Sequence, residues 1–129
     1  MDMVYAVIGL ALLQYCIFAG FVGRARVKSG VEAPAVTGDP EFEKYYRVHY
    51  NTMEQLVIFL PAILLFAHYI SELWAAILGL VFVMGRAIYF RAYITDPARR
   101  GAGFGLTMLP NTVLMLGGLG GAAWAVFTG

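Results

Sequence analysis

The chain has 129 residues, of which 60% are hydrophobic and only 13% are charged. Soluble domains contain about half apolar and about a quarter charged residues, so this composition indicates an integral membrane protein. The formal net charge of +1 does not suggest a nucleic-acid partner, and a single cysteine excludes both a disulfide framework and a cluster of thiolate metal ligands.

The first predicted helix covers residues 3–23, which contain no charged side chain. About 20 apolar residues span a bilayer, so this segment is long enough to cross it. A basic flank of Arg24, Arg26 and Lys28 follows it. Residues 29–38 are rich in glycine, proline and small side chains, which is typical of a loop.

The second predicted helix covers residues 40–70 and begins at Asp39-Pro40. Aspartate is a favoured capping residue, and proline is favoured at the first helical position. A helix of this length measures about 46 Å, whereas the hydrocarbon core of a bilayer is about 30 Å thick. The first turns of the helix are therefore expected to project from the membrane.

Three polar side chains of this helix share one face, because Arg47, Asn51 and Glu54 are spaced i, i+4 and i+7. Counting about 20 residues back from residue 70 places Asn51 and Glu54 within the membrane and Arg47 near its interface. Charged groups at membrane depth are costly and usually functional.

The third predicted helix covers residues 73–94. Its uncharged run ends at Gly85 and is too short to span a bilayer, so Arg86 is expected at membrane depth. Arg86, Tyr89 and Tyr93 are spaced i, i+3 and i+7 and share one face.

The fourth predicted helix covers residues 97–128, after a second cap-and-proline pair at Asp96-Pro97. Gly117 and Gly121 in this helix permit close helix contact, either as a packing face or as a contact between copies. The connections 24–46 and 91–101 are basic, so the positive-inside tendency predicts that both face the cytoplasm. The absence of an ER-retention signal favours a bacterial inner membrane, with the ER membrane as the alternative.

Glu54 and Arg86 lie at similar distances, roughly 21–25 Å, from the turn between the second and third helices. Glu54, Arg86 and Tyr89 are therefore expected at one level of the membrane. Arginines outnumber carboxylates at this level, which suggests an anionic ligand.

At these residues the chain resembles the MAPEG family, the membrane-associated proteins in eicosanoid and glutathione metabolism. The resemblance covers about residues 10–120. The elements that carry it are Glu41-Phe42-Glu43, then Arg47, Asn51 and Glu54, then Arg86, Tyr89 and Tyr93, and finally Arg100. It implies an all-α four-helix protomer, a homotrimer, and glutathione bound between protomers near the cytosolic side.

The resemblance also implies a function: a membrane-bound glutathione transferase or peroxidase, acting on lipophilic electrophiles or lipid hydroperoxides. Glutathione is the expected co-substrate, and no metal is expected because His49 and His68 lack a second ligand at metal-binding spacing. Arg100 is implied to activate the thiol. Contacts with glutathione are implied at Arg26, Arg47, Asn51, Glu54, Tyr89 and Tyr93. Arg47, Arg26 or Arg86 can hold the carboxylates of glutathione through paired hydrogen bonds.

Three positions depart from the family's pattern. Leukotriene-forming members have adjacent arginines at the end of the first helix, whereas here Arg26 is followed by Val27, which leaves Arg24 or Lys28 as a replacement. The family's glutamine before the asparagine is His49 here, and its tyrosine after the glutamate is Gln55.

Other interpretations stay open at this point. The chain is also consistent with a non-catalytic lipid-binding or partner-binding protein of the same fold, which would not need Arg100 and Glu54. A small four-helix transporter is a third possibility, although the charges cluster at one face instead of along a path. Arg86 is equally consistent with a structural partner of Glu54 or of a backbone carbonyl, and the tyrosines with interfacial belt residues.

Overall fold

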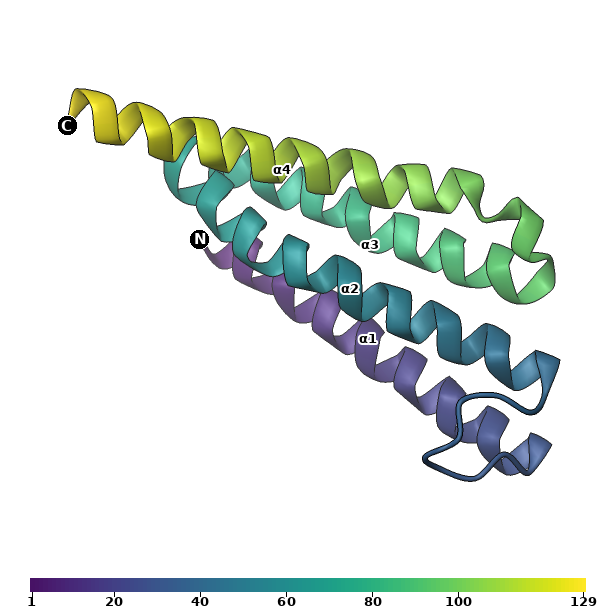
Figure 1. Cartoon of the computed structure of the whole chain (residues 1–129). Coiled ribbons are helices and arrows are strands. Elements are labelled where there is room, and N and C mark those ends of the chain that lie inside the picture. Colours follow the sequence, from purple (N-terminus) through teal and green to yellow (C-terminus); the bar gives the residue numbers. More distant parts are fainter.

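The computed structural model describes residues 1–129 as four long helices without a strand (Figure 1). The helices are α1 (Asp2–Ser29), α2 (Pro40–Tyr69), α3 (Glu72–Thr95) and α4 (Gly101–Thr128), with a short 3-10 helix, η1 (Pro97–Arg99), before α4. Each of the four is long and apolar enough to cross a membrane. The prediction of an all-α bundle with four membrane spans is therefore confirmed.

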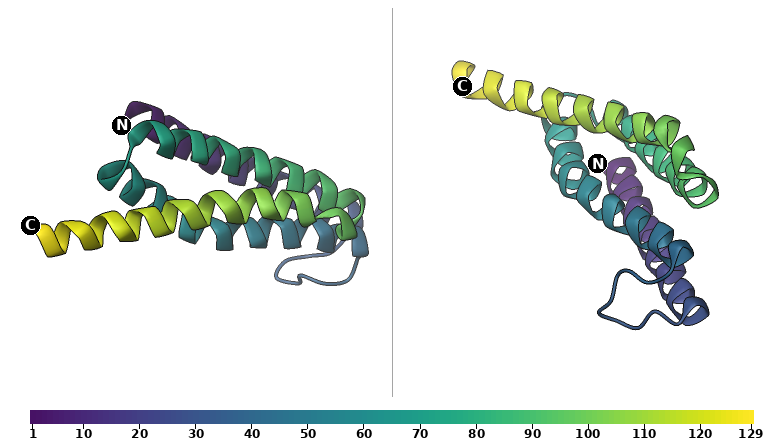
Figure 2. Two further views of the ribbon diagram at one scale, coloured as in Figure 1. Left: turned by 90° about the horizontal axis from the view of Figure 1, so that it is seen from above. Right: turned by 45° about the vertical axis from the view of Figure 1, so that its right-hand side comes forward.

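The four helices run along one axis as two pairs. α2 and α3 are the central helices, because α1 and α4 each pack against both of them. Both termini and the α2–α3 turn lie at one end, and the two other connections lie at the opposite end (Figures 1 and 2). The α1–α2 pair diverges from the α3–α4 pair toward this second end (Figures 1 and 2).

The first helix is longer than predicted, because α1 continues to Ser29 instead of ending near residue 23. The length of the apolar run corresponds to the thickness of the membrane. The helix itself continues until the backbone changes conformation. That change occurs at Gly30, which has a φ of 78° and donates its N–H to the carbonyl of Arg26. The predicted loop 24–46 is thus helical at both ends and reduces to residues 30–39, and residues 91–95 belong to α3.

The hydrophobic core lies in the half of the bundle near the termini, and all four helices contribute to it. At its centre the rings of Phe59 and Phe82 stack with their centroids 4.0 Å apart. In a bilayer such packing, rather than burial from water, holds helices together. The two helix pairs are therefore held together mainly at this end of the bundle.

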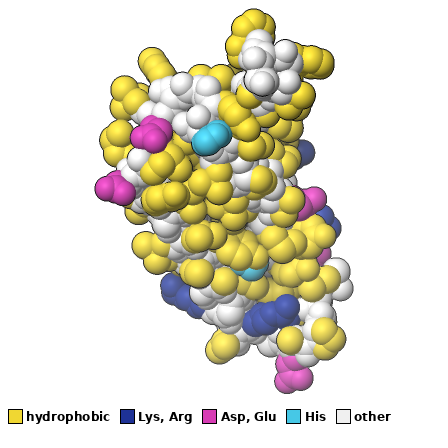
Figure 3. Space-filling model, turned by 90° about the vertical axis from the view of Figure 1, so that its left-hand side faces the viewer, with side chains coloured by type: hydrophobic (Ala, Val, Ile, Leu, Met, Phe, Trp, Pro, Cys, Tyr) yellow, Lys and Arg dark blue, Asp and Glu magenta, His cyan; other side chains and the backbone are white.

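The glycine pair of the fourth helix makes contacts within the chain. A Cβ added at Gly117 would lie 2.6 Å from the ring of Phe66, and one at Gly121 would lie 2.5 Å from Tyr69 Cβ. Of the two predicted uses, the structure shows packing of α4 on α2 of the same protomer. Hydrophobic side chains make up much of the surface seen from the end with the termini, and a few charged side chains lie among them (Figure 3).

Candidate functional site

A cavity of about 610 Å³ lies where the two helix pairs diverge. Its walls come from the α1–α2 loop, the first half of α2, the end of α3, and the residue before α4. The lining residues are Val36, Thr37, Tyr46, Arg47, Tyr50, Asn51, Glu54, Tyr89, Tyr93 and Arg100.

The cavity brings together six of the eight predicted site residues. From α2, the i, i+4, i+7 spacing directs Arg47, Asn51 and Glu54 to the same space. Tyr89 and Tyr93 meet them from α3, with their rings stacked at a centroid distance of 5.6 Å. Glu54 and Tyr89, which are expected at one level of the membrane, therefore line the same cavity.

The charged groups of the cavity have no ionic partner within the protein. Arg47, Glu54 and Arg100 are exposed, and none of them belongs to an ion pair. The Oδ1 atom of Asn51 is buried without a hydrogen-bond partner. These groups are consequently free to bind a polar ligand that carries charges of both signs.

Arg100 is held by a local turn. Asp96 Oδ1 accepts a hydrogen bond from the N–H of Ala98 at 3.1 Å, and Arg100 Nη1 donates to the carbonyl of Pro97 at 2.8 Å. Arg100 is the N-cap residue of α4. The first backbone amides of a helix lack intrahelical acceptors, so this corner of the cavity combines a guanidinium with a positive helix end.

Arg86 was expected to contact the ligand or Glu54, and the structure places it elsewhere. Its side chain is fully buried within the protomer and does not line the cavity. Nη2 donates to Thr52 Oγ1 at 2.9 Å and Nη1 donates to Thr107 Oγ1 at 3.3 Å. The reason for the difference is that two threonines, one from α2 and one from α4, offer acceptors on the inner side of α3.

Arg26 also lies outside the cavity of its own chain. Its Nη1 donates to the carbonyl of Ala35 at 2.7 Å, and its guanidinium lies 4.7 Å from the ring centroid of Phe42. It therefore ties the α1–α2 loop to the end of α1. The adjacent residues Val36 and Thr37 form the wall of the cavity, so Arg26 supports that wall from behind.

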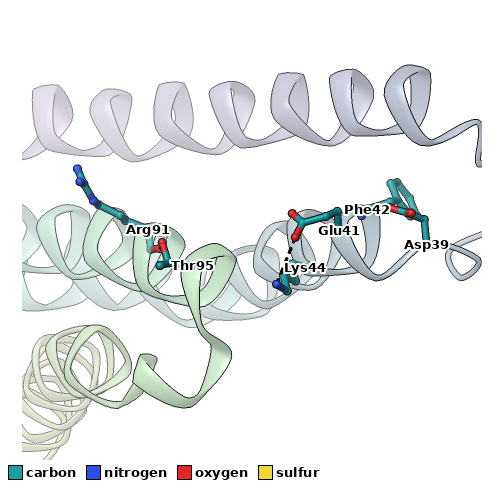
Figure 4. A network of polar contacts seen from close by, with 6 residues as sticks. All are labelled: Asp39, Glu41, Phe42, Lys44, Arg91 and Thr95. Atoms are coloured by element: carbon teal, nitrogen blue, oxygen red, sulfur yellow. Dashed lines mark hydrogen bonds and ion pairs between the residues drawn. The ribbon is translucent and has the colours of Figure 1, made fainter.

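A second cavity, of about 380 Å³, lies between the end of α1 and the start of α2. Arg24 and Lys28 line this cavity, and neither lines the larger one. Two carboxylates, Asp39 and Glu41, line it as well. Asp39 accepts a hydrogen bond from the N–H of Phe42, and Glu41 is paired with Lys44 (Figure 4). The distance from Lys44 Nζ to Glu41 Oε1 is 3.4 Å.

Sequence reasoning did not identify Tyr46 and Tyr50, which also line the larger cavity. The two tyrosines lie four residues apart. Each comes directly before a predicted site residue of α2, Arg47 and Asn51 respectively. This spacing is visible in the sequence. Whether the two tyrosines reach the cavity depends on its width, and the width depends on how far the two helix pairs diverge.

Comparison with known proteins agrees with this architecture. The family model of the MAPEG family matches residues 3–120. An uncharacterized protein of Synechocystis sp. is 44% identical over 89% of this chain and 84% of its own length. Microsomal glutathione S-transferase 2 of Homo sapiens is 38% identical over 86% of this chain and 76% of its own. Leukotriene C4 synthase of Cavia porcellus is 38% identical over 65% of this chain and 56% of its own. The chain is an integral membrane protein that belongs to the MAPEG family.

Proposed function

We propose that the chain is a membrane-bound glutathione transferase, which ionises the glutathione thiol for attack on lipophilic electrophiles or lipid hydroperoxides. The observation that carries the proposal is the larger cavity, where Arg47 and Arg100 face the same space as Glu54. The names of two relatives, microsomal glutathione S-transferase 2 and leukotriene C4 synthase, support a glutathione-dependent activity.

The cavity offers a binding group for each charged part of glutathione, which has two carboxylates, one ammonium and a thiol. Arg47 can bind a carboxylate with paired hydrogen bonds. Glu54 can bind the ammonium. Asn51 can accept a hydrogen bond at Oδ1, the atom that lacks a partner in the protein, while its amide donates to an oxygen.

Arg100 is proposed to stabilise the thiolate. A free thiol has a pKa of about 8.5, so little of it is ionised at neutral pH. A guanidinium at the positive end of α4 favours the ionised form. The sulfur then attacks an electrophilic carbon, a C–S bond forms, and the leaving group departs with its electron pair.

The same thiolate can attack the terminal oxygen of a lipid hydroperoxide. An S–O bond forms and the O–O bond breaks, which leaves an alkoxide that takes up a proton to give the alcohol. A second glutathione then forms the disulfide and releases water. Both reactions require the same activated sulfur, so the substrate that reaches the cavity from the bilayer decides between them.

We further propose a homotrimer in which a neighbouring copy closes the cavity. Arg47 and Glu54 are exposed on the side of the protomer, and a carboxylate that faces hydrocarbon is costly. A neighbour at this face would shield both groups. Arg26, which does not line the cavity of its own chain, is then the candidate contact from the neighbour.

The cavity is proposed to open toward the cytoplasm of a bacterial inner membrane. The connections 30–39 and 96–100 lie at the same end of the bundle. Arg24, Arg26, Lys28 and Arg91 flank them, and Arg99 lies within the second connection. Positive residues of this kind favour the cytoplasmic side. The similarity to a Synechocystis protein supports a bacterial source.

The proposal is tested by ultraviolet difference absorbance, which detects thiolate when glutathione is added to detergent-purified protein. Arg100→Ala should lose the signal. Arg99→Ala is the matched control, because Arg99 is exposed, precedes Arg100 and does not line the cavity. Binding of glutathione without thiolate in the parent protein would instead indicate a non-catalytic binding protein, and absence of binding would refute the assignment.

A further inference from the structure

Arg86 is a fully buried arginine with no anionic partner. The ion pairs of the protein involve Glu41 and Glu72 only, so no carboxylate lies within ion-pair distance of this guanidinium. Its Cζ atom lies 4.3 Å from the ring centroid of Tyr89. Its hydrogen-bond acceptors are two threonine hydroxyls, and its Nε atom has no partner at all.

The two threonines are fixed as neutral acceptors. Thr52 Oγ1 donates its own proton to the carbonyl of Val48 at 2.7 Å, and Thr107 Oγ1 donates to the carbonyl of Gly103 at 2.9 Å. Each hydroxyl therefore presents only lone pairs to Arg86. The guanidinium is oriented by these contacts, but its positive charge is not neutralised by any of them.

An unneutralised charge at this depth is costly, and a neutral side chain could join the same helices at lower cost. The charge is therefore expected to act on something outside the cluster. Tyr89 provides the connection, because its ring is in contact with Arg86 and also lines the larger cavity. Arg86 thus lies behind the cavity wall, with one aromatic ring between the cation and the bound ligand.

The formal charges of the cavity lining can be compared with those of glutathione. The ionisable groups that line the cavity are Arg47 and Glu54 from α2, Arg100 before α4, and the tyrosines Tyr46, Tyr50, Tyr89 and Tyr93. Two arginines and one glutamate give the lining a net charge of +1, which balances glutathione with a protonated thiol (−1). The thiolate form carries −2, and Arg86 adds one positive charge to that of the lining and to that of Arg26 from a neighbouring copy.

We propose that Arg86 is a positioning residue, a buried cation that fixes Tyr89 and stabilises the thiolate form of bound glutathione through the wall of the cavity. This inference rests on the proposed function, and it assigns Arg86 a role without direct contact to the ligand. Arg100 stabilises the sulfur from the open side, and Arg86 does so from the protein interior.

The test is a pH titration of bound glutathione, followed by thiolate absorbance, in variants that separate charge from packing. Arg86→Gln removes the charge and keeps a donor for the threonines, and Arg86→Met is a second neutral variant. Arg86→Lys keeps the charge. Thr107→Val is the packing control, because it keeps the charge and removes one acceptor of Arg86.

The neutral variants should shift the thiolate midpoint upward by about one and a half pH units, the effect of a unit charge about 8 Å away at an effective dielectric constant near 20. Arg86→Lys and Thr107→Val should lower the thermal stability but leave the midpoint within about a third of a unit of the parent value. An unchanged midpoint in the neutral variants overturns the inference and leaves the proposed function intact. An equal shift in Thr107→Val overturns it too, since packing would then explain the effect. Absence of thiolate in the parent protein removes both proposals.

Discussion

Gly103→Ala tests the contact between α3 and α4 that supports the cavity wall. A Cβ at residue 103 would lie 2.5 Å from Tyr89 Cα and 2.8 Å from Tyr89 Cβ, closer than such atoms approach in proteins. Because these atoms are backbone and Cβ, no change of rotamer relieves the clash, and α4 has to move away from α3. Overpacking of this kind costs about 1–3 kcal/mol, and we expect a destabilisation of about 3 kcal/mol here.

The matched control is Gly105→Ala, two residues later in the same helix. A Cβ at residue 105 meets nothing within 4 Å, so the substitution only replaces glycine by a better helix former. It should raise the stability by up to about 1 kcal/mol, which places the two variants about 4 kcal/mol apart.

Thermal unfolding of detergent-purified protein, followed by circular dichroism, measures the difference, and the KM for glutathione measures the displacement of Tyr89. Gly103→Ala should lower the unfolding midpoint and raise the KM, whereas Gly105→Ala should leave the KM unchanged. Equal midpoints for the two variants would refute the close approach of α3 and α4 at Tyr89. A normal KM in a destabilised Gly103→Ala would refute the link between this contact and the ligand.

Two further predictions concern the ends of the ligand. Glu54→Gln should weaken glutathione binding about tenfold or more in calorimetry, the loss expected for one hydrogen bond between charged groups. N-acylated glutathione has no ammonium, so it should bind the parent protein and Glu54→Gln with equal affinity. Arg26→Gln should release the α1–α2 loop from its hydrogen bond to Ala35 and increase limited proteolysis within residues 30–39. If Arg26→Gln instead weakens glutathione binding without a change in proteolysis, Arg26 acts as a ligand contact from a neighbouring copy.

The residues of the cavity could largely be predicted from the sequence, because depth in a membrane follows from counting. Glu54 and Tyr89 were placed at one level from their distances to the α2–α3 turn, and both line the same cavity. Spacing alone also placed Arg47, Asn51 and Glu54 on one face. Helices of known rise and a bilayer of known thickness leave little freedom along the axis.

The direction of a side chain around the axis was much harder to predict. Arg86 shares a face with Tyr89 and Tyr93 by spacing, yet its guanidinium turns inward to Thr52 and Thr107. These acceptors belong to two other helices, so no pattern within α3 reveals them. The predicted end of α1 was wrong for a similar reason. Hydropathy indicates where the membrane-spanning segment ends, whereas the helix ends at Gly30 because of its backbone conformation.

The two departures from the family's pattern on α2 leave the lining of the cavity intact. The ring of His49 stacks on Tyr15 of α1 at a centroid distance of 4.4 Å, and Gln55 is buried and accepts hydrogen bonds from Asn111 of α4 through its backbone and side-chain oxygens, at 3.2 Å each. Neither residue lines the cavity. Both flank the polar face of α2, and each joins α2 to a different neighbouring helix. Substitution at these positions therefore changes how α2 is held between α1 and α4, whereas the groups that face the ligand stay the same. Since the divergence of the helix pairs sets the width of the cavity, these contacts are expected to affect which lipophilic substrate fits beside glutathione more than they affect the activation of the thiol.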